Sequence, residues 1–378
     1  MMCMEQLIQS VLDINYKNNI LKRASFMLAL FVCINTNAEL LLEKKVYIVK
    51  PISETGQVIS KGDAADDPAI WVNPYNPSNS LVFGSDKRSG IYTFDLLGNE
   101  ISYTKIGRIN NIDLRSIDFE NKGSFSFIFA SNRSKHSLDL WIYENKAIDL
   151  LINNESFYIQ KNSNFSINSK MIVYGVCAGY DKRFGVVAFL TEDEGPHVEM
   201  YQYYDDGLRL LKRFKNQNSE QSEGCVYDDE NRTLFISEEG ERGIIRAYDI
   251  NDDLDFSNFN VVDTREGFID EDPEGLTIYK TDANKGYLIA SSQGDNSFNL
   301  YNRQNPYDYI GSFKIGHSLD IDNVSDTDGI DVTNINLGAN YKKGLFVVQD
   351  GTNDGVEIVE RQNFKYVSFE DVIKVLNL

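Results

Sequence analysis

The feature that most constrains the fold is a motif that occurs six times along the chain. Each copy has an apolar run, a polar turn rich in charged residues, and a second run of strand-forming residues. The copies begin 46 to 59 residues apart, and they read LVFGSDKRSGIYTFDL from Leu81, FIFASNRSKHSLDLWIY from Phe127, VVAFLTEDEGPHVEMYQY from Val186, TLFISEEGERGIIRAY from Thr233, GYLIASSQGDNSFNLY from Gly286 and GLFVVQDGTNDGVEIVE from Gly344. Two such runs around a short polar turn are typical of a β-hairpin.

A second element lies just upstream of each hairpin, where a polar or acidic cluster runs into a short apolar stretch. The six are DDPAIWV (66–72), NNIDLRSID (110–118), VYGVCAGY (173–180), SEGCVYD (222–228), DPEGLTIY (272–279) and TDGIDVT (327–333). Units of three or four strands repeated six times are typical of β-propeller blades. The sequence therefore predicts an all-β fold, a six-bladed β-propeller, in which only FEDVIKVL near the C-terminus is weakly helical. A pair of β-sandwiches would explain the strands but not the repeated order.

The N-terminal region resembles a secretory signal. Residues 22–38 read KRASFMLALFVCINTNA, in which two basic residues precede an apolar run that is too short to span a bilayer and that ends in small residues. We expect cleavage after Ala38, with translation starting either at the first Met or near Met27. Residues 39–378 are then a single propeller domain, secreted or periplasmic, with no membrane insertion.

The charge balance excludes some partners. The formal net charge is −20, so the surface repels nucleic acid and anionic lipid. An acidic protein can still bind an anionic substrate if metal cations stand between the two. Two cysteines, Cys177 and Cys225, remain after residue 38; they are no disulfide framework, and their spacing leaves open whether they pair.

Acidic residues flank the predicted innermost strands of several blades. Because these strands run roughly parallel around one axis, we expect their first residues to meet at one end of the channel, where like charges repel unless cations neutralise them. All-oxygen ligands favour calcium. For any one acid a solvated turn or a helix cap is the simpler interpretation, but the set favours metal: Asp66, Asp67, Asp113, Glu223, Asp272, Glu274, Asp326 and Asp328.

Three basic residues occupy the turns of the first two hairpins. Lys87 and Arg88 lie in the first turn and Arg133 lies in the second. Arginine suits bidentate phosphate binding and lysine serves as a point charge, so these turns are candidates for binding phosphate. Ordinary solubilisation of an exposed turn is the alternative.

Other catalytic motifs fit poorly. CAGYDKR (177–183) has the Cys-x5-Arg spacing of cysteine phosphatases, but Val176 precedes it, Phe184 follows it, and Asp181 would place a negative charge in the phosphate loop. The chain has three histidines, none in an Arg-His-Gly context, and too few for a histidine-rich zinc or iron site. It contains no Walker A loop, no G-x-G-x-x-G loop and no G-x-S-x-G elbow.

Taken together, these stretches resemble the β-propeller phytases, calcium-dependent secreted enzymes that hydrolyse myo-inositol hexakisphosphate. The resemblance covers nearly all of residues 50–370 and is most specific at DAADDPAIW (63–71) and SDTDGIDV (325–332). It implies release of inorganic phosphate from calcium–phytate and other inositol phosphates by attack of a metal-activated water, several bound calcium ions, and a six-bladed propeller. We expect a monomer.

The resemblance also implies roles for individual residues. Phosphate contacts fall on Lys87, Arg88 and Arg133, and catalysis falls on Lys87, Arg133, Tyr174, Glu223 and Glu239. Calcium ligands fall on Glu54, Asp67, Tyr174, Glu223, Asp272, Glu274, Gln293, Asp320, Asp326 and Asp350.

One stretch departs from the family pattern. The family usually has a lysine in the third-blade turn that helps to hold phosphate, whereas the turn here reads LTEDEG and contains Glu192, Asp193 and Glu194. Phosphate affinity at this turn is then weaker, or depends on more calcium. A non-catalytic calcium-stabilised propeller, or another calcium-dependent hydrolase such as a lactonase or phosphodiesterase, would explain the acids but not the basic turns.

Overall fold

The computed structural model divides into two units, residues 1–44 and Lys45–Leu378, and it describes residues 44–145, 158–354 and 361–378. The predicted signal segment and its cleavage point lie outside the described residues. Within those residues, no helix has the length and apolar character needed to cross a membrane.

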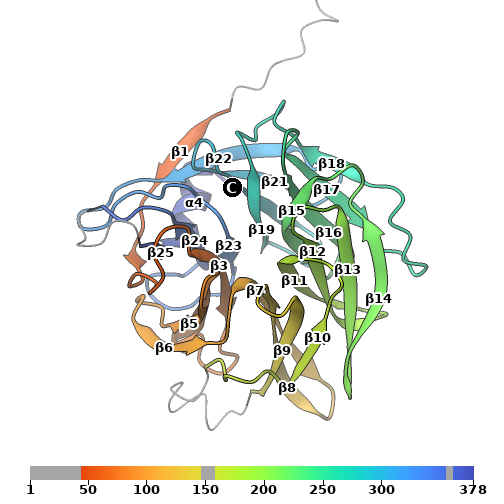
Figure 1. The fold of residues 1–378 in the computed structure, drawn as a ribbon. Helices are drawn as coiled ribbons and strands as arrows, with labels where there is room; N and C mark the ends of the chain where they lie inside the picture. The colour runs from red at the N-terminus through yellow and green to blue at the C-terminus, as the bar shows by residue number, and fades with distance from the viewer. Residues whose placement is uncertain (1–43, 146–157, 355–360) are drawn as a thin grey trace, which may run out of the picture. The chain divides into compact units, whose positions relative to one another are not determined.

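The second unit is a ring of six β-sheets around a central axis, which confirms the predicted six-bladed propeller (Figure 1). Blades one and two contain β3 (Ala65–Trp71), β4 (Leu81–Asp86), β5 (Gly90–Phe94), β6 (Glu100–Lys105), β7 (Ile109–Phe119), β8 (Gly123–Asn132), β9 (Ser137–Glu144) and β10 (Phe165–Asn168). Blades three and four contain β11 (Val173–Asp181), β12 (Gly185–Glu192), β13 (His197–Tyr204), β14 (Gly207–Lys215), β15 (Gln221–Asp228), β16 (Thr233–Glu239), β17 (Ile244–Asp249) and β18 (Asn260–Asp263). Blades five and six contain β19 (Pro273–Lys280), β20 (Gly286–Ser292), β21 (Ser297–Asn302), β22 (Tyr309–Ile315), β23 (Ile330–Val332), β24 (Leu345–Asp350) and β25 (Asn363–Ser368).

The two ends of the unit close the ring together. β2 (Ser53–Glu54) is the outermost strand of blade six, whose other strands come from the C-terminal part of the chain, and β1 (Val46–Val49) pairs in parallel with β22 of blade five. The predicted helix is α4 (Phe369–Leu376), which contacts β1 and β22. A 3-10 turn, η1 (Pro77–Asn79), links β3 to β4. Strands near the two ends of the sequence therefore share sheets, which ties the ring shut.

The partner of β24 lies beyond the sixth motif. VEIVE (356–360), the second run of that motif, lies outside the described residues, and the strand that pairs with β24 is β25, Asn363–Ser368. The apolar alternation of NFKYVS is as good as that of VEIVE, and every residue of β25 is buried. β24 ends at Asp350 and β25 begins only at Asn363, which explains why spacing along the chain did not locate this strand.

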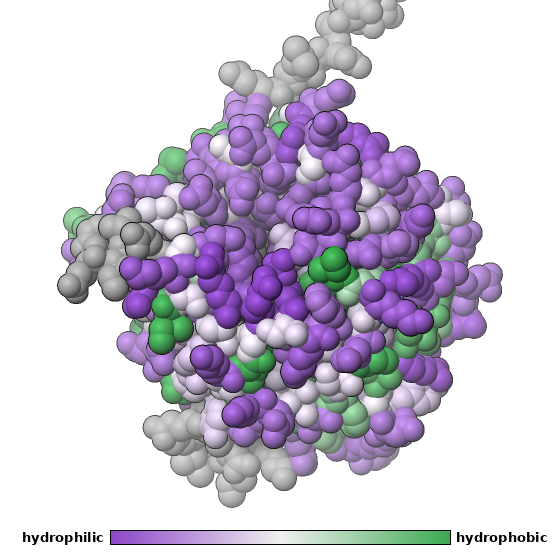
Figure 2. Space-filling model, in the orientation of Figure 1, coloured by the Kyte–Doolittle hydropathy of each residue, from purple (hydrophilic) through white to green (hydrophobic). Residues whose placement is uncertain are grey.

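Six hydrophobic clusters form the core, one between each pair of neighbouring blades. Trp71 and Phe83 of blade one, for example, pack with Ile128 and Trp141 of blade two. Inner strands are buried on both faces, so they read as nearly continuous apolar runs, whereas the outer strand β6 is half-buried. The face in Figure 2 is mainly hydrophilic around its middle.

Candidate functional site at the mouth of the channel

Five of the six inner strands are irregular at the same place. The pairing of each inner strand with the next strand skips two residues in β3, β7, β11, β15 and β19. A bulge of this kind turns side chains out of the regular alternation of a strand. The first skipped residues are Asp66, Asn110, Tyr174, Glu223 and Glu274, and Asp328 precedes β23 at the corresponding place in blade six. We call these six residues the mouth.

Small residues and hydroxyl groups hold the bulges in place. A Cβ atom on Gly175 would lie 2.0 Å from the carbonyl oxygen of Glu223, so only glycine allows the two inner strands to approach this closely. The Ser85 hydroxyl accepts a hydrogen bond from the backbone N–H of Asp67 at 2.9 Å, and Thr191 accepts one from Gly175 at 2.8 Å. Ser131 accepts one from the backbone N–H of Asn111 at 3.0 Å. Ser237 and Ser291 instead donate to the carbonyl oxygens of Glu274 and Asp328 in the next blade, at 2.7 and 2.9 Å.

The mouth brings carboxylates from four blades together. Oxygens of Asp66, Glu223 and Asp328 lie within 4.8 Å of one another, and so do oxygens of Glu223, Glu239 and Glu274. The side-chain amide of Asn110 donates hydrogen bonds to Asp66, at 2.9 Å, and to Glu223. Blades one, four, five and six therefore concentrate negative charge at one place, beside the amide of Asn110 from blade two.

The pKa values of these carboxyl groups show that nearby positive charge does not balance their negative charge. Burial raises the pKa of Glu223, Glu274 and Asp328 well above the usual carboxyl range, and neighbouring carboxylates raise it further. Burial also raises the pKa of Glu239 to about 7. For Lys87, burial alone would lower the pKa, but the nearby carboxylates outweigh it and raise the pKa well above the usual value.

A basic pocket adjoins the mouth. Lys87, Arg88, Arg108 and Arg133 line a cavity of about 440 Å³ together with Asp63. The ammonium of Lys87 lies 2.7 Å from Asp63 and 2.8 Å from Asp66, so it joins the pocket to the acids. Among the described residues, no carboxylate forms an ion pair with Arg88 or Arg108. The pocket can therefore accept an anion next to the carboxylates.

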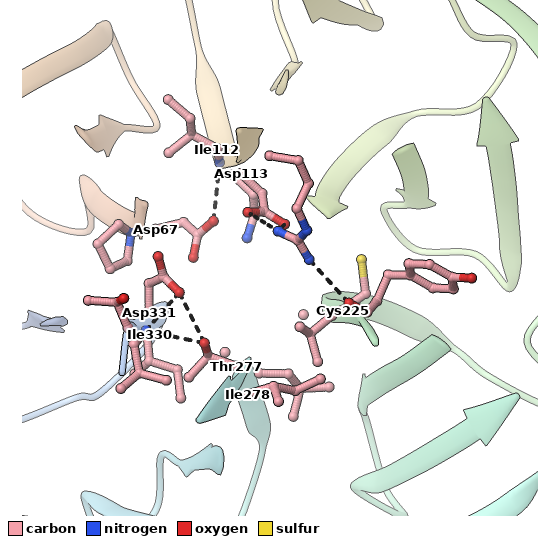
Figure 3. Close-up of a pocket in the computed structure, with 18 of the residues that line it drawn as sticks. Asp67, Ile112, Asp113, Cys225, Thr277, Ile278, Ile330 and Asp331 are labelled. Atoms are coloured by element: carbon pink, nitrogen blue, oxygen red, sulfur yellow. Dashed lines mark hydrogen bonds and ion pairs between the residues drawn. The ribbon is translucent and has the colours of Figure 1, made fainter. Parts of the chain in front are cut away.

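Asp67 does not lie with the mouth acids, although it follows Asp66 directly. Its carboxylate accepts a hydrogen bond from the backbone N–H of Ile112 at 3.1 Å and faces a cavity of about 380 Å³ enclosed by the six inner strands (Figure 3). Asp113 and Asp331 line the same cavity, so the expectation that Asp113 joins the mouth is wrong. The bulge explains the separation, because it turns consecutive residues of β3 toward different parts of the channel.

The remaining predicted ligands lie in several places. Asp272 accepts a hydrogen bond from Arg265 at 2.5 Å, and the backbone N–H of Gln293 donates to the carbonyl of Asp272 at 3.0 Å. Asp320 and Asp326 are exposed. These residues contribute less to the enclosed charge than Glu223 or Glu274.

Glu54 and Asp350 belong to a different group of acids in blade six. The ammonium of Lys365 is fully buried and lies 2.6 Å from Asp350 and 4.0 Å from Glu54, and it also donates a hydrogen bond to Asp322. We call Asp322, Asp350 and Lys365 the blade-six cage. Burial raises the pKa of Asp350 to about 6, although Lys365 opposes the rise.

A disulfide joins Cys177 of β11 to Cys225 of β15, with 5.6 Å between their Cα atoms. The sequence had left open whether these two cysteines pair. The bond joins the inner strands of blades three and four. Arg183 forms an ion pair with Asp252. Cys177 therefore has no free thiol, and Arg183 is held elsewhere, so a cysteine-phosphatase loop is excluded.

The sequence did not identify two residues of the site or the hydroxyl groups that hold the bulges in place. Asn110 and Arg108 were not proposed as site residues, although they occupy the positions in blade two that correspond to Asp66 and Ala64. The supporting hydroxyl groups occupy one aligned position in five of the six hairpins: Ser85, Ser131, Thr191, Ser237 and Ser291. Aligning the repeats residue by residue, rather than by motif order, would have found all of them.

Comparisons with known proteins point to one family. A family model described as Phytase matches residues 17–377. The 3-phytase of Bacillus subtilis (strain 168) is 36% identical over 368 residues, which span 95% of this chain and 94% of that protein. Among solved structures, a gluconolactonase from Xanthomonas campestris has a TM-score of 0.44 at 13% identity, with 84% of this chain and 88% of that chain covered. The WD40 domain of Toxoplasma gondii coronin also has a TM-score of 0.44, at 8% identity, with 80% and 69% covered. Structural similarity this low carries no argument about function.

Proposed function

The chain belongs to the phytase family, and on that premise we propose that it hydrolyses phosphomonoesters of phytate at the mouth and the adjoining basic pocket, releasing inorganic phosphate. The observation that carries this proposal is the contact between the two: the Lys87 ammonium bridges Asp63 of the pocket and Asp66 of the mouth. A scaffold protein would not need an anion pocket beside a cation site.

The mouth is chemically suited to calcium. Buried oxygens of Glu239 and Glu274 have no hydrogen-bond partner, and the donors are all oxygen, which calcium prefers. We propose that the calcium-binding residues are Asp66, Tyr174, Glu223, Glu239, Glu274 and Asp328, with Asp67, Asp272 and Gln293 near further ions. When bound, calcium supplies positive charge that offsets the substrate phosphates and makes bound water more acidic.

The basic pocket binds and orients the phosphate groups. Lys87 and Arg133 lie nearest the acids, so they stabilise the negative charge on the phosphate that reacts. Arg88 and Arg108 lie at the outer part of the pocket and hold a second phosphate of the same substrate. Substrates that carry several phosphates gain from both contacts.

Tyr174 keeps its proton in this setting. Burial and the carboxylates of Glu223 and Glu239 raise its pKa far above the usual value for tyrosine. Its hydroxyl therefore keeps a proton that it can donate in a hydrogen bond to a phosphate oxygen. This role agrees with the position of the Tyr174 ring beneath Arg133, 5.1 Å from the guanidinium carbon.

Three further features belong to the same proposal. The substrate binds as its calcium complex, since the protein carries a net charge of −20 and phytate is also an anion. The protein acts as a monomer outside the cytoplasm, after removal of residues 1–38. Phytate at that location would be reached without crossing a membrane.

The test is release of inorganic phosphate from phytate by the purified protein in calcium. Arg133→Gln should lower kcat/KM by about 100- to 1,000-fold, as expected for loss of a group that stabilises developing charge. Arg183→Gln is the matched control, because Arg183 also pairs with an aspartate in a turn but lies outside the pocket. No phosphate release by the wild-type protein, or an equal loss in both variants, would overturn the proposal.

A further inference from the structure

The first residue of the hairpin turn is structurally equivalent in the first three blades. The backbone N–H of Lys87 donates to the carbonyl of Ala64 at 2.7 Å, that of Arg133 donates to Arg108 at 2.7 Å, and that of Asp193 donates to Ile172 at 2.8 Å. In each blade the acceptor precedes the mouth residue by two positions. Asp193 therefore occupies in blade three the place that a phosphate-binding cation occupies in blades one and two.

The carboxylate of Asp193 is directed at one of those cations. Its Oδ2 lies 2.6 Å from Nη2 of Arg133, and the two side chains are only 17% and 20% exposed. The other terminal nitrogen of Arg133, Nη1, donates to Oδ1 of Asn110 at 2.9 Å. Both terminal nitrogens of this guanidinium are thus engaged before any ligand arrives.

We propose that Asp193 is an affinity-determining residue that competes with the phosphate of the substrate for Arg133. A phosphate oxygen can take the N–H of Nη2 that is directed at Asp193 only if the carboxylate leaves it. A phosphate on the remaining N–H groups of Arg133 would lie beside that negative charge, so in either case Asp193 opposes binding. The inference rests on the proposed function, because it concerns the same pocket. It goes beyond that function by identifying a residue that weakens, rather than strengthens, binding.

The structure shows why Asp193 can be displaced. Among the described residues, Arg133 is the one hydrogen-bond or ion-pair partner of its carboxylate, so no second contact holds it. The residue lies in the turn between β12 and β13, next to the exposed Glu194, and not within a strand. Asn110, by contrast, is also bonded to Asp66 and Glu223 and keeps Arg133 in position.

The experiment measures binding of inorganic phosphate and turnover of phytate, both in saturating calcium. Asp193→Asn keeps the size of the side chain and removes its charge, and it should lower the Ki for inorganic phosphate by about tenfold, as expected for losing a competing charge-assisted contact. The KM for phytate should fall similarly, while kcat changes less than about twofold. Glu194→Gln removes one charge from the next position and should change neither constant.

A double-mutant cycle separates competition from a general change in charge. In an Arg133→Gln background, Asp193→Asn should no longer affect the Ki for phosphate, because the contact it relieves is absent. If Asp193→Asn does not fold, Asp193→Ser serves instead, with thermal unfolding as the check.

Other outcomes overturn the inference in distinct ways. An unchanged Ki in Asp193→Asn would show that Asp193 does not compete, and a raised Ki would show that it helps to hold phosphate through a cation. Calorimetric binding of inorganic phosphate does not depend on turnover, so it tests Asp193 even if phytate is not hydrolysed. Failure of wild-type turnover alone would count against the proposed function and not against the competition.

Discussion

The mouth and the blade-six cage both bury carboxylates, but they balance the charge differently. In the cage, Asp322 and Asp350 share the fully buried ammonium of Lys365. At the mouth, Lys87 pairs with Asp66 and Asp328, while Glu223 and Glu274 have no ion-pair partner among the described residues.

The difference separates a structural site from a functional one. A buried charge is tolerated when it is paired, and an unpaired one raises its pKa or recruits a cation from outside. The cage supplies its own cation and needs none from solvent. The mouth leaves its acids short of positive charge, and under the proposed function bound calcium would supply it.

The largest expected effect comes from removing those ions. Chelation of calcium should lower kcat/KM for phytate by at least about a thousand-fold, because the mouth then repels the substrate and loses several kcal/mol of charge stabilisation. Phosphate release before and after EDTA, followed by restoration with calcium, is the measurement. Activity that survives full chelation would mean that Lys87 and the arginines suffice.

The next largest effect should be a loss of stability caused by a change in the cage, with catalysis largely unchanged. Lys365→Met removes the ammonium and strands two buried aspartates, which should lower the free energy of unfolding by about 3–5 kcal/mol. Lys314→Met is the control, because Lys314 is partly exposed and 3.9 Å from Asp295. Urea unfolding measures both.

The same variant tests whether the cage is independent of calcium. The loss in Lys365→Met should be equal in EDTA and in calcium. If calcium restores its stability, then Glu54 and Asp350 can bind an ion as the family resemblance implies. The cage and the mouth would then both take a cation from solvent.

A smaller effect on the free energy of unfolding, a gain rather than a loss, is expected at the mouth. Burial and four neighbouring carboxylates raise the pKa of Glu274, so Glu274→Gln relieves repulsion. In EDTA near pH 8 the variant should be more stable than wild type by about 1–2 kcal/mol, and calcium should stabilise it less. Denaturant unfolding with and without calcium gives both numbers, and a variant destabilised in EDTA would show that Glu274 is not repelled.

Most of the fold could be predicted from the sequence because each repeat forms its hairpin from residues that are close together in the chain. Each hairpin carries its own apolar runs and turn, and six copies leave few architectures other than a propeller. The closure by β1 and β2 could not be predicted in this way, since it pairs residues such as Ser53 and Tyr366 that are remote in sequence. The same is true of β25, which begins at Asn363, well after β24 ends at Asp350.

The sequence predicted many of the residues that form the site but not how their side chains are arranged. Lys87 and Arg133 were found because they lie in the turns of the first two hairpins, Glu223 was found because it flanks a predicted inner strand, and the family resemblance then gave all three a role. The separation of Asp66 from Asp67 depends on a bulge whose effect on side-chain direction the motif does not state. The pairing of Arg133 with Asp193 depends on the distance between two turns in adjacent blades, and the sequence identified only the unusual charge.

The smallest effect is a pH dependence that distinguishes the two regions in metal-free protein. Burial raises the pKa of Glu239 to about 7, above its unfolded value of about 4.3. A group whose pKa is raised on folding contributes stability below its unfolded pKa and loses that contribution as pH rises through the folded pKa. In EDTA, Tm should therefore fall by a few degrees between pH 5 and pH 8. Groups with lowered pKa, such as Asp181, lose their contribution at lower pH and do not oppose this trend.

Calcium should remove most of this fall, because ions at the mouth favour the ionised carboxylates. Asp350 of the cage also has a raised pKa, of about 6, but Lys365 already accompanies it. Any part of the fall that persists in calcium is then assigned to groups outside the mouth, namely Asp350 and the channel residue Asp331, whose pKa burial raises to about 7. Glu239→Gln should reduce only the calcium-sensitive part. Thermal unfolding across this pH range, with and without calcium, would contradict the comparison if the two curves stayed parallel.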